Sequence, residues 1–132
     1  MNTQATSGFE IDAWDEQPYV ETEDGGKLTR AHVKQTFRGD IDGHGEVEWL
    51  MCYLPDNTAD FVGLQRVFGR VGERSGSMVL ETTGTFDGNQ AKGPLRIIPG
   101  SGTGELTGIH GEGELRAPLG GQPSLTLTYR FD

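Results

Sequence analysis

Four residues with amide, hydroxyl or thiol side chains occupy positions that an alternating sequence predicts to face the inside of a β structure: Gln35, Cys52, Gln65 and Thr82. Most neighbours of the same parity are apolar, and a buried amide without a partner costs about 1 to 3 kcal/mol. Each polar group therefore needs either a bound molecule or an internal partner, such as another of the four or a buried water. Amides and hydroxyls do not titrate near neutral pH, so they offer a ligand hydrogen bonds. Trp14, at the predicted mouth, completes this candidate ligand site.

Nucleophilic, metal-binding and phosphate-binding sites have little support in the sequence. No basic residue is predicted beside Cys52, so nothing favours its thiolate form. His32, His44 and His110 fall on different predicted elements and lack the spacing of a metal site. The glycine-rich segment 99–113 lacks the lysine of a phosphate-binding loop. We therefore expect no catalytic residue, no metal and no cofactor.

Size and charge exclude several classes of protein. The 132 residues suit one domain, residues 1–132. A formal net charge of -9 repels phosphate backbones, which argues against a nucleic-acid partner. The single cysteine excludes an internal disulfide and fits a reducing compartment. No stretch is apolar enough to span a bilayer and no secretory leader is recognisable, so we expect a cytoplasmic protein without a membrane partner.

Alternation of apolar and polar residues predicts eight β-strands. They cover approximately residues 5–14, 28–38, 46–54, 60–71, 76–86, 90–98, 112–117 and 124–132. Residues 15–27 are acidic and contain Pro18, which predicts a long irregular connection able to act as a lid. Eight antiparallel strands can close into a barrel whose interior holds side chains or one small ligand. We therefore predict an all-β fold, an eight-stranded antiparallel closed β-barrel.

Two predicted turns, at Asp42-Gly43 and Asp56-Asn57, set the faces of the third strand. They place three of its residues inside the barrel: Leu50, Cys52 and Leu54. An apolar outer face then combines the alternate residues with two from the next strand: Trp49, Met51, Tyr53, Leu64 and Phe68. A contiguous apolar patch of this kind predicts the interface of a homo-oligomer, a dimer or larger.

A two-residue loop at Glu73-Arg74 sets the register of the next strand pair. It places Gln65 opposite Thr82 on the inner face and pairs Arg66 with Glu81 on the outer face. Several glycines share the inner face, where they relieve crowding: Gly63, Gly69, Gly84 and Gly93.

Residues 99–113 are rich in glycine and predict a compact turn structure. Leu106 and Ile109 are three residues apart and can share one side of a single helical turn. We predict that this segment is a short plug over one end of the barrel, placed before the seventh strand.

Two resemblances support the barrel. Gly102-Thr103-Gly104, followed by Leu106 and Gly111, resembles the closing motif of the allene oxide cyclase and dirigent barrels. Over most of its length the chain resembles a bacterial family of small proteins known only as a domain of unknown function. The segments that carry this resemblance are Trp14-Asp15-Glu16, Leu50-Met51-Cys52-Tyr53, Phe61-Val62-Gly63-Leu64, Gly76-Ser77-Met78-Val79-Leu80 and Pro99-Gly100-Ser101-Gly102-Thr103-Gly104. The resemblance implies an allene oxide cyclase-like barrel, also described as calycin-like.

The resemblance also implies a difference at the inner face. Members of that family often carry an acid at the position of Gln65 and a histidine at that of Thr82. Here an amide and a hydroxyl replace this potential proton-transfer pair.

Three functions remain open from the sequence. The first is a barrel that binds a small apolar or amphipathic molecule without transforming it. The second is a cofactor-independent isomerase or cyclase of the allene oxide cyclase type, which needs a charged or activated group in the lumen. The third is a packed structural barrel that acts through self-association. A lumen of roughly 300 Å³ or more favours ligand binding, and a filled core favours the third function.

Overall fold

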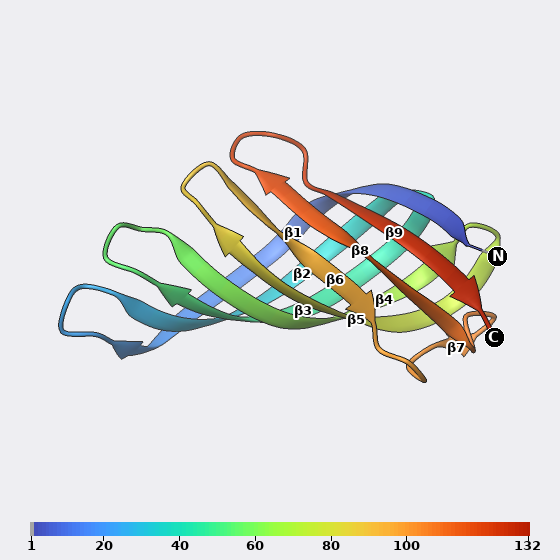
Figure 1. Cartoon of the computed structure of the whole chain (residues 1–132), viewed down its shortest axis with the longest axis horizontal. Coiled ribbons are helices and arrows are strands. Elements are labelled where there is room, and N and C mark those ends of the chain that lie inside the picture. The colour runs from blue at the N-terminus through green and yellow to red at the C-terminus, as the bar shows by residue number, and fades with distance from the viewer. Residues whose placement is uncertain (1) are drawn as a thin grey trace.

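A computed structural model describes residues 2–132 as nine β-strands. The strands are β1 (Thr3–Glu21), β2 (Lys27–Gly39), β3 (Ile41–Tyr53), β4 (Ala59–Val71), β5 (Arg74–Phe86), β6 (Gln90–Ile97), β7 (Thr103–Gly104), β8 (Ile109–Pro118) and β9 (Ser124–Phe131). Eight of them form an antiparallel ring in the order β4-β3-β2-β1-β9-β8-β6-β5, which the β4–β5 pairing closes (Figure 1). The predicted closed eight-stranded barrel is therefore confirmed. Residues 2–132 contain no helix long and apolar enough to cross a membrane.

The core lies inside the ring and is built from alternate residues of each strand. Its least exposed members are Ala31, Val33, Met78, Leu80 and Leu125. Successive side chains of a strand point to opposite faces, so a closed ring buries one complete face of every strand.

The predicted plug is confirmed at the end of the barrel where both termini lie (Figure 1). Within it, β7 pairs with Gly76 and Ser77 of β5, outside the ring. Leu106 and Ile109 are each only 1% exposed and belong to the core cluster. The plug therefore covers this end with apolar side chains.

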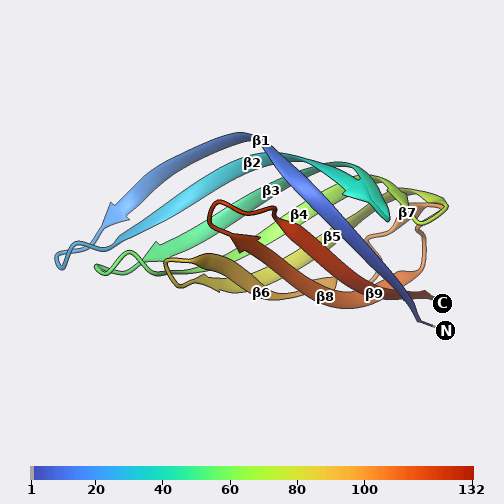
Figure 2. The ribbon, with the colours of Figure 1, turned by 90° about the horizontal axis from the view of Figure 1, so that it is seen from above.

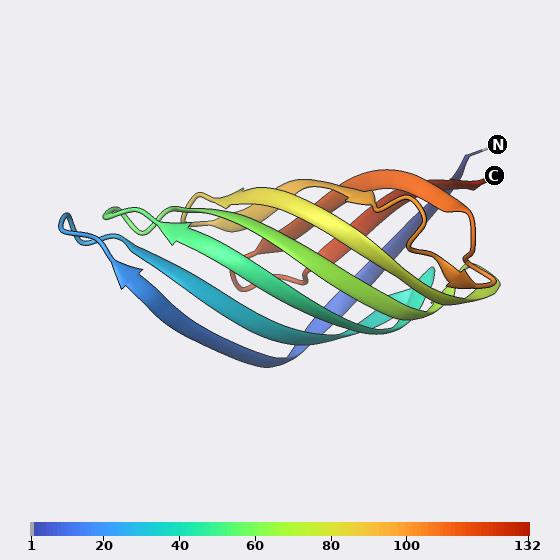
Figure 3. The ribbon, with the colours of Figure 1, turned by 90° about the horizontal axis from the view of Figure 1, so that it is seen from below.

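The hairpin of β1 and β2 extends beyond the other hairpins at the opposite end of the barrel (Figures 1 and 3). The irregular lid predicted for residues 15–27 is wrong, because β1 continues to Glu21 and pairs with β2 as far as Lys27. Pro18 is compatible with this strand because β1 lies on an edge there and has a bulge just after it, which are positions where proline occurs in sheets. A short turn between Glu21 and Lys27 joins the two strands.

Along most of its length, β1 has no partner strand at the edge that faces away from β2. β1 pairs with β9 only from Thr3 to Gly8, and then curves away from it (Figure 2). Beyond Gly8, the described chain makes only two further hydrogen bonds to the β1 backbone on that side. The Phe9 N–H donates to the Pro123 carbonyl, and the Phe9 carbonyl accepts from the side-chain amide of Gln122. Bulges between Ile11 and Ala13 and between Pro18 and Val20 interrupt the strand's pairing with β2.

The predicted faces of β3 are wrong. The chain reverses at Gly39 and Asp40, so Phe37 pairs with Gly43, and Asp42-Gly43 lies within the β3 ladder. Moving the turn inverts β3: Trp49 is buried inside, whereas Leu50 and Cys52 are exposed outside. The pairing across the turn predicted at Asp56-Asn57 also differs from the prediction by an odd number of residues, because Tyr53 pairs with Ala59. The two errors cancel, so β2 keeps its predicted faces.

The faces of β4 and β5 are as predicted, but their register differs by two residues. Val71 pairs with Arg74, which places Gln65 opposite Leu80 and Gly63 opposite Thr82. A shift of two residues preserves the inside and outside faces but separates predicted partners. Gln65 and Thr82 therefore share the inner face without lying directly opposite each other.

Candidate functional site

The open end of the barrel contains an apolar pocket of about 100 Å³. Its lining comes from six strands of the ring and comprises Phe9, Ile11, Trp14, Gln35, Trp49, Met51, Phe61, Ala91, Leu115 and Ala117. Gln35 supplies the only polar side chain of this lining. Two large apolar residues at the mouth, Ile11 and Trp14, remain 47% and 46% exposed although they face the pocket.

Two glycines make room for the aromatic rings beside the pocket. A Cβ at Gly63 would overlap the Trp49 ring, and one at Gly84 would overlap the Phe61 ring. The two rings then meet edge to face, with their centroids 5.0 Å apart. This agrees with the prediction that inner-face glycines relieve crowding, since each glycine accommodates a ring from the neighbouring strand.

The polar groups of the lumen lie within the barrel and have few partners. Gln35 and Gln65 are 3% and 2% exposed, and the Gln65 side-chain amide donates a hydrogen bond to the Gln35 carbonyl oxygen. Thr82 is 1% exposed, and its hydroxyl has no hydrogen-bond partner among residues 2–132. The amides therefore satisfy each other in part, and the Thr82 hydroxyl stays unpaired.

A carboxylate lies next to the pocket on the inner face of the β1–β2–β3 ribbon. The bulge at Asp12 shifts the parity of β1, so Trp14 and Glu16 both face inward, opposite Val33 and Ala31. The Trp14 indole N–H donates to one oxygen of Glu16 at 2.9 Å, and the Thr29 hydroxyl donates to the other at 2.6 Å. Trp14 therefore belongs both to the pocket lining and to the carboxylate's hydrogen-bond network.

The donors around Glu16 keep it ionised. Partial burial raises the pKa of its carboxyl group, but hydrogen bonds from Thr29, Trp14 and Tyr53 outweigh burial, and Lys27 adds an attractive charge. The net effect lowers the pKa of Glu16 below its ordinary value of 4.5. Glu16 therefore presents a negative charge at neutral pH.

Tyr53 contributes a hydroxyl group to the set of residues around Glu16. Desolvation, followed by the hydrogen bond and charge of Glu16, raises the pKa of Tyr53 to about 12. Its hydroxyl also lies 3.6 Å from the sulfur of Met51, which lines the pocket. Tyr53 therefore remains a neutral donor at physiological pH and connects Glu16 to the pocket wall.

The structure separates the candidate site residues predicted from the sequence. Trp14 lies at the mouth, Gln35 lines the pocket, and Gln65 and Thr82 are buried in the barrel. Cys52 does not join them because it is exposed on the outer face.

The residues of the predicted oligomer interface likewise lie on two different faces of the barrel. Trp49 and Met51 line the pocket and Tyr53 shares their inner face, whereas Leu64 is exposed outside and Phe68 is partly buried beside His44. The inversion of β3 is the reason. On the outer face of β3 and β4, the exposed large apolar residues are Leu50, Val62 and Leu64. The homo-oligomer stays a prediction.

Sequence reasoning missed Glu16 and Thr29 as site residues and assigned Tyr53 to the oligomer interface. Trp14 and Glu16 are two residues apart, which is the spacing that places two side chains on one face of a strand. The sequence predicts residues 15–21 to be irregular, and an irregular segment has no strand face on which this spacing could place Glu16.

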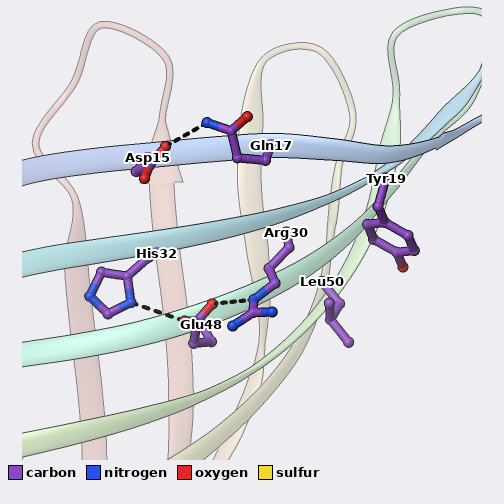
Figure 4. A pocket seen from close by; sticks show the side chains of 7 residues that line it. All are labelled: Asp15, Gln17, Tyr19, Arg30, His32, Glu48 and Leu50. Carbon is purple, nitrogen blue, oxygen red and sulfur yellow. Dashed lines mark hydrogen bonds and ion pairs between the residues drawn. The ribbon is translucent and has the colours of Figure 1, made fainter.

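A second concavity lies on the outer face of β1, β2 and β3 (Figure 4). It has a volume of about 560 Å³ and is lined by Asp15, Gln17, Tyr19, Arg30, His32, Glu48 and Leu50. Its polar groups bind one another: Glu48 lies 3.0 Å from His32 and 3.3 Å from Arg30, and Gln17 donates to Asp15. The hydrogen bond from His32, followed by that from Arg30, lowers the pKa of Glu48. Because these contacts already occupy its charged groups, the concavity is the weaker candidate.

Comparison with known proteins agrees with the fold. The sequence profile of the family described as "Protein of unknown function (DUF3224)" matches residues 5–129. Curated protein sequences give no match. The chain is similar to a solved structure, a protein of unknown function from the DUF3224 family of Shewanella oneidensis MR-1. The two chains are 27% identical, the alignment covers 100% of this chain and 98% of that chain, and the TM-score is 0.83.

Proposed function

The chain belongs to the DUF3224 family, and we propose that its barrel binds a small apolar or amphipathic molecule at the open end. The observation that carries this proposal is the exposure of Ile11 and Trp14 at the mouth of an apolar pocket. Large apolar side chains around a concave site gain free energy when a ligand removes them from water, at about 25 cal/mol per Å². A pocket with an apolar wall and one polar group is also typical of small-molecule sites.

The volume of the pocket limits which part of a ligand can enter. About 100 Å³ is less than the roughly 300 Å³ expected above for a lumen that encloses a ligand, so the pocket does not meet that expectation. It is also smaller than an engineered apolar cavity of about 150 Å³ that binds benzene. We therefore propose that only one apolar end of the ligand enters, while the rest lies against Ile11 and Trp14.

The filled part of the barrel favours a second candidate, a packed structural protein that needs no ligand. Met78 and Leu80 are completely buried, and the plug closes the other end. The isomerase or cyclase has less support, because the pocket lining contains no ionisable side chain. Glu16 lies outside this lining and is occupied by several donors.

Tryptophan fluorescence can test the proposal, since Trp14 and Trp49 both line the pocket. Titration with 1-hexanol should change the emission saturably and raise the melting temperature. Trp14→Ala should weaken binding at least fivefold. Tyr19→Ala is the matched control, because Tyr19 is an exposed aromatic residue of the same strand that lines the outer concavity. Absence of any saturable response in the unmodified protein would instead favour the packed structural barrel.

A further inference from the structure

We infer that the ligand is an amphipathic amine, whose apolar end enters the pocket while its protonated nitrogen binds the carboxylate of Glu16. The inference rests on the proposed function and specifies the chemical class of the ligand. It depends on the placement of one ionised group beside an otherwise apolar wall.

The position of Glu16 suits a group that projects from the pocket. Trp14 lines the mouth and donates to Glu16, and Met51 lines the wall two residues before Tyr53. Residues two apart on a strand share a face. Glu16 and Tyr53 therefore lie on the inner face of β1 and β3, each two residues farther along its strand than Trp14 and Met51, which line the pocket. A molecule with its apolar end inside would therefore extend its other end along Trp14 toward Glu16.

Glu16 retains capacity for another donor. A carboxylate offers about four acceptor positions. Hydrogen bonds from Trp14 and Thr29 occupy two of them, and the Tyr53 hydroxyl lies close enough to help lower the pKa of the carboxyl group. These bonds also fix the carboxylate in place, so a ligand would not have to order a mobile side chain.

The charges around the mouth favour a cation over an anion. β1 carries five acids and no basic residue, and of these Glu16 shares the inner face with the pocket, whereas Asp15 lines the outer concavity and Glu10 pairs with Arg38. The nearest basic residue to the carboxylate is Lys27, whose ammonium lies 5.1 Å from the centre of the Tyr53 ring. The exposed Trp14 ring adds a favourable surface for a cation.

Basic residues on the opposite rim do not reverse this preference. Lys92 follows the lining residue Ala91, and Arg116 lies between the lining residues Leu115 and Ala117. Alternation along a strand directs Lys92 and Arg116 to the outer face, where Arg116 contacts Glu114. A carboxylate ligand would therefore meet Glu16 without a compensating cation from that rim.

The test compares three ligands with the same six-carbon chain: hexylamine, 1-hexanol and hexanoate at pH 7. Binding is followed by the NMR signal of the Trp14 indole N–H, which donates to Glu16. We expect the amine to bind at least tenfold more tightly than hexanoate, with the alcohol in between. High salt should reduce this difference, because a partly exposed ion pair is screened.

Glu16→Gln should reduce the preference for the amine over hexanoate to less than threefold and leave the affinity for 1-hexanol within twofold. Asp15→Asn is the matched control, since it removes the same charge from a neighbouring residue that lines the outer concavity. It should leave the preference above fivefold. Equal binding of all three ligands by the unmodified protein, or tightest binding of hexanoate, would overturn the inference but leave the proposed function standing. Failure of all three to bind would overturn both.

Discussion

The Gln65 side-chain amide donates a hydrogen bond to the Gln35 carbonyl oxygen inside the barrel, between two side chains that are almost completely buried. The two residues come from non-adjacent strands, β2 and β4, on either side of β3. Their side chains meet above Gly45, where a Cβ would lie 3.2 Å from the Gln35 oxygen. The bond therefore spans β3 and connects two strands that share no backbone ladder.

Gln65→Leu should destabilise the protein by about 1 to 3 kcal/mol, because it leaves the buried Gln35 amide without its partner. The double substitution Gln35→Leu with Gln65→Leu should cost less than the sum of the single substitutions, because neither partner is then left unpaired. Urea denaturation measures all three free energies of unfolding. Additive effects would show that the bond contributes no coupling.

Gly63→Ala should destabilise the protein by about 2 kcal/mol or more, since the new methyl group would overlap the Trp49 ring and lie 2.7 Å from the Glu48 carbonyl oxygen. Gly8→Ala is the control, because its Cβ would meet only the flexible end of Gln122, at 3.3 Å. We expect the control to change the free energy of unfolding by less than about 1 kcal/mol. Equal effects of the two substitutions would contradict the proposed packing of Trp49 over Gly63.

Thr82→Val should leave stability unchanged or raise it by about 1 kcal/mol, because it replaces an unpaired buried hydroxyl with a methyl group of similar size. Thermal denaturation and urea denaturation provide the measurement. Thr82→Ala is the comparison, and it should be destabilising because it also removes a methyl group from the core. A clear loss of stability in Thr82→Val would mean that the hydroxyl does bind a partner, such as a buried water.

Glu16 should contribute stability that depends on pH. Its folded-state pKa is lowered from 4.5, so the contribution is fully present above about pH 4.5 and is lost as the pH falls through the folded-state value. The difference in unfolding free energy between the unmodified protein and Glu16→Gln should therefore shrink toward acidic pH. Other carboxylates with lowered pKa values, such as Asp24 and Asp56, are present in both proteins and cancel. A difference that stays constant between pH 3 and pH 7 would contradict this role of Glu16.

The barrel could be predicted because the alternation of inner and outer side chains along a strand is preserved when the predicted register is wrong by an even number of residues. Shifting the β4–β5 register by two residues leaves Gln65 and Thr82 inside, since the side-chain period of a strand is two. The same property makes β3 vulnerable, because a turn displaced by one residue inverts all its side chains. Asp42-Gly43 is a strong hairpin signal, yet the chain reverses earlier, at Gly39 and Asp40, and Gly39 has a φ of 130°.

The site was less predictable than the fold because it depends on a bulge. Without the extra residue at Asp12, parity would place Trp14 and Glu16 on the outer face of β1. Bulges arise from how a strand fits its neighbours, and no residue type in this segment marks one. The carboxylate beside the pocket therefore becomes apparent only when the pairing of β1 with β2 is known.

The open side of β1 exposes backbone groups that could accept a strand from another molecule, as in the growth of an amyloid sheet. Features of the strand itself protect it from such pairing. Its bulges interrupt the regular spacing of its backbone hydrogen-bonding groups, and Pro18 has no backbone N–H to donate. Glu10, Asp12 and Asp15 also give the strand a high density of negative charge. Colloidal stability of the protein thus depends on the same acidic strand that shapes the mouth of the barrel. Replacing those acids would therefore weaken the barrier to fibril formation, even where it leaves the ligand preference unchanged.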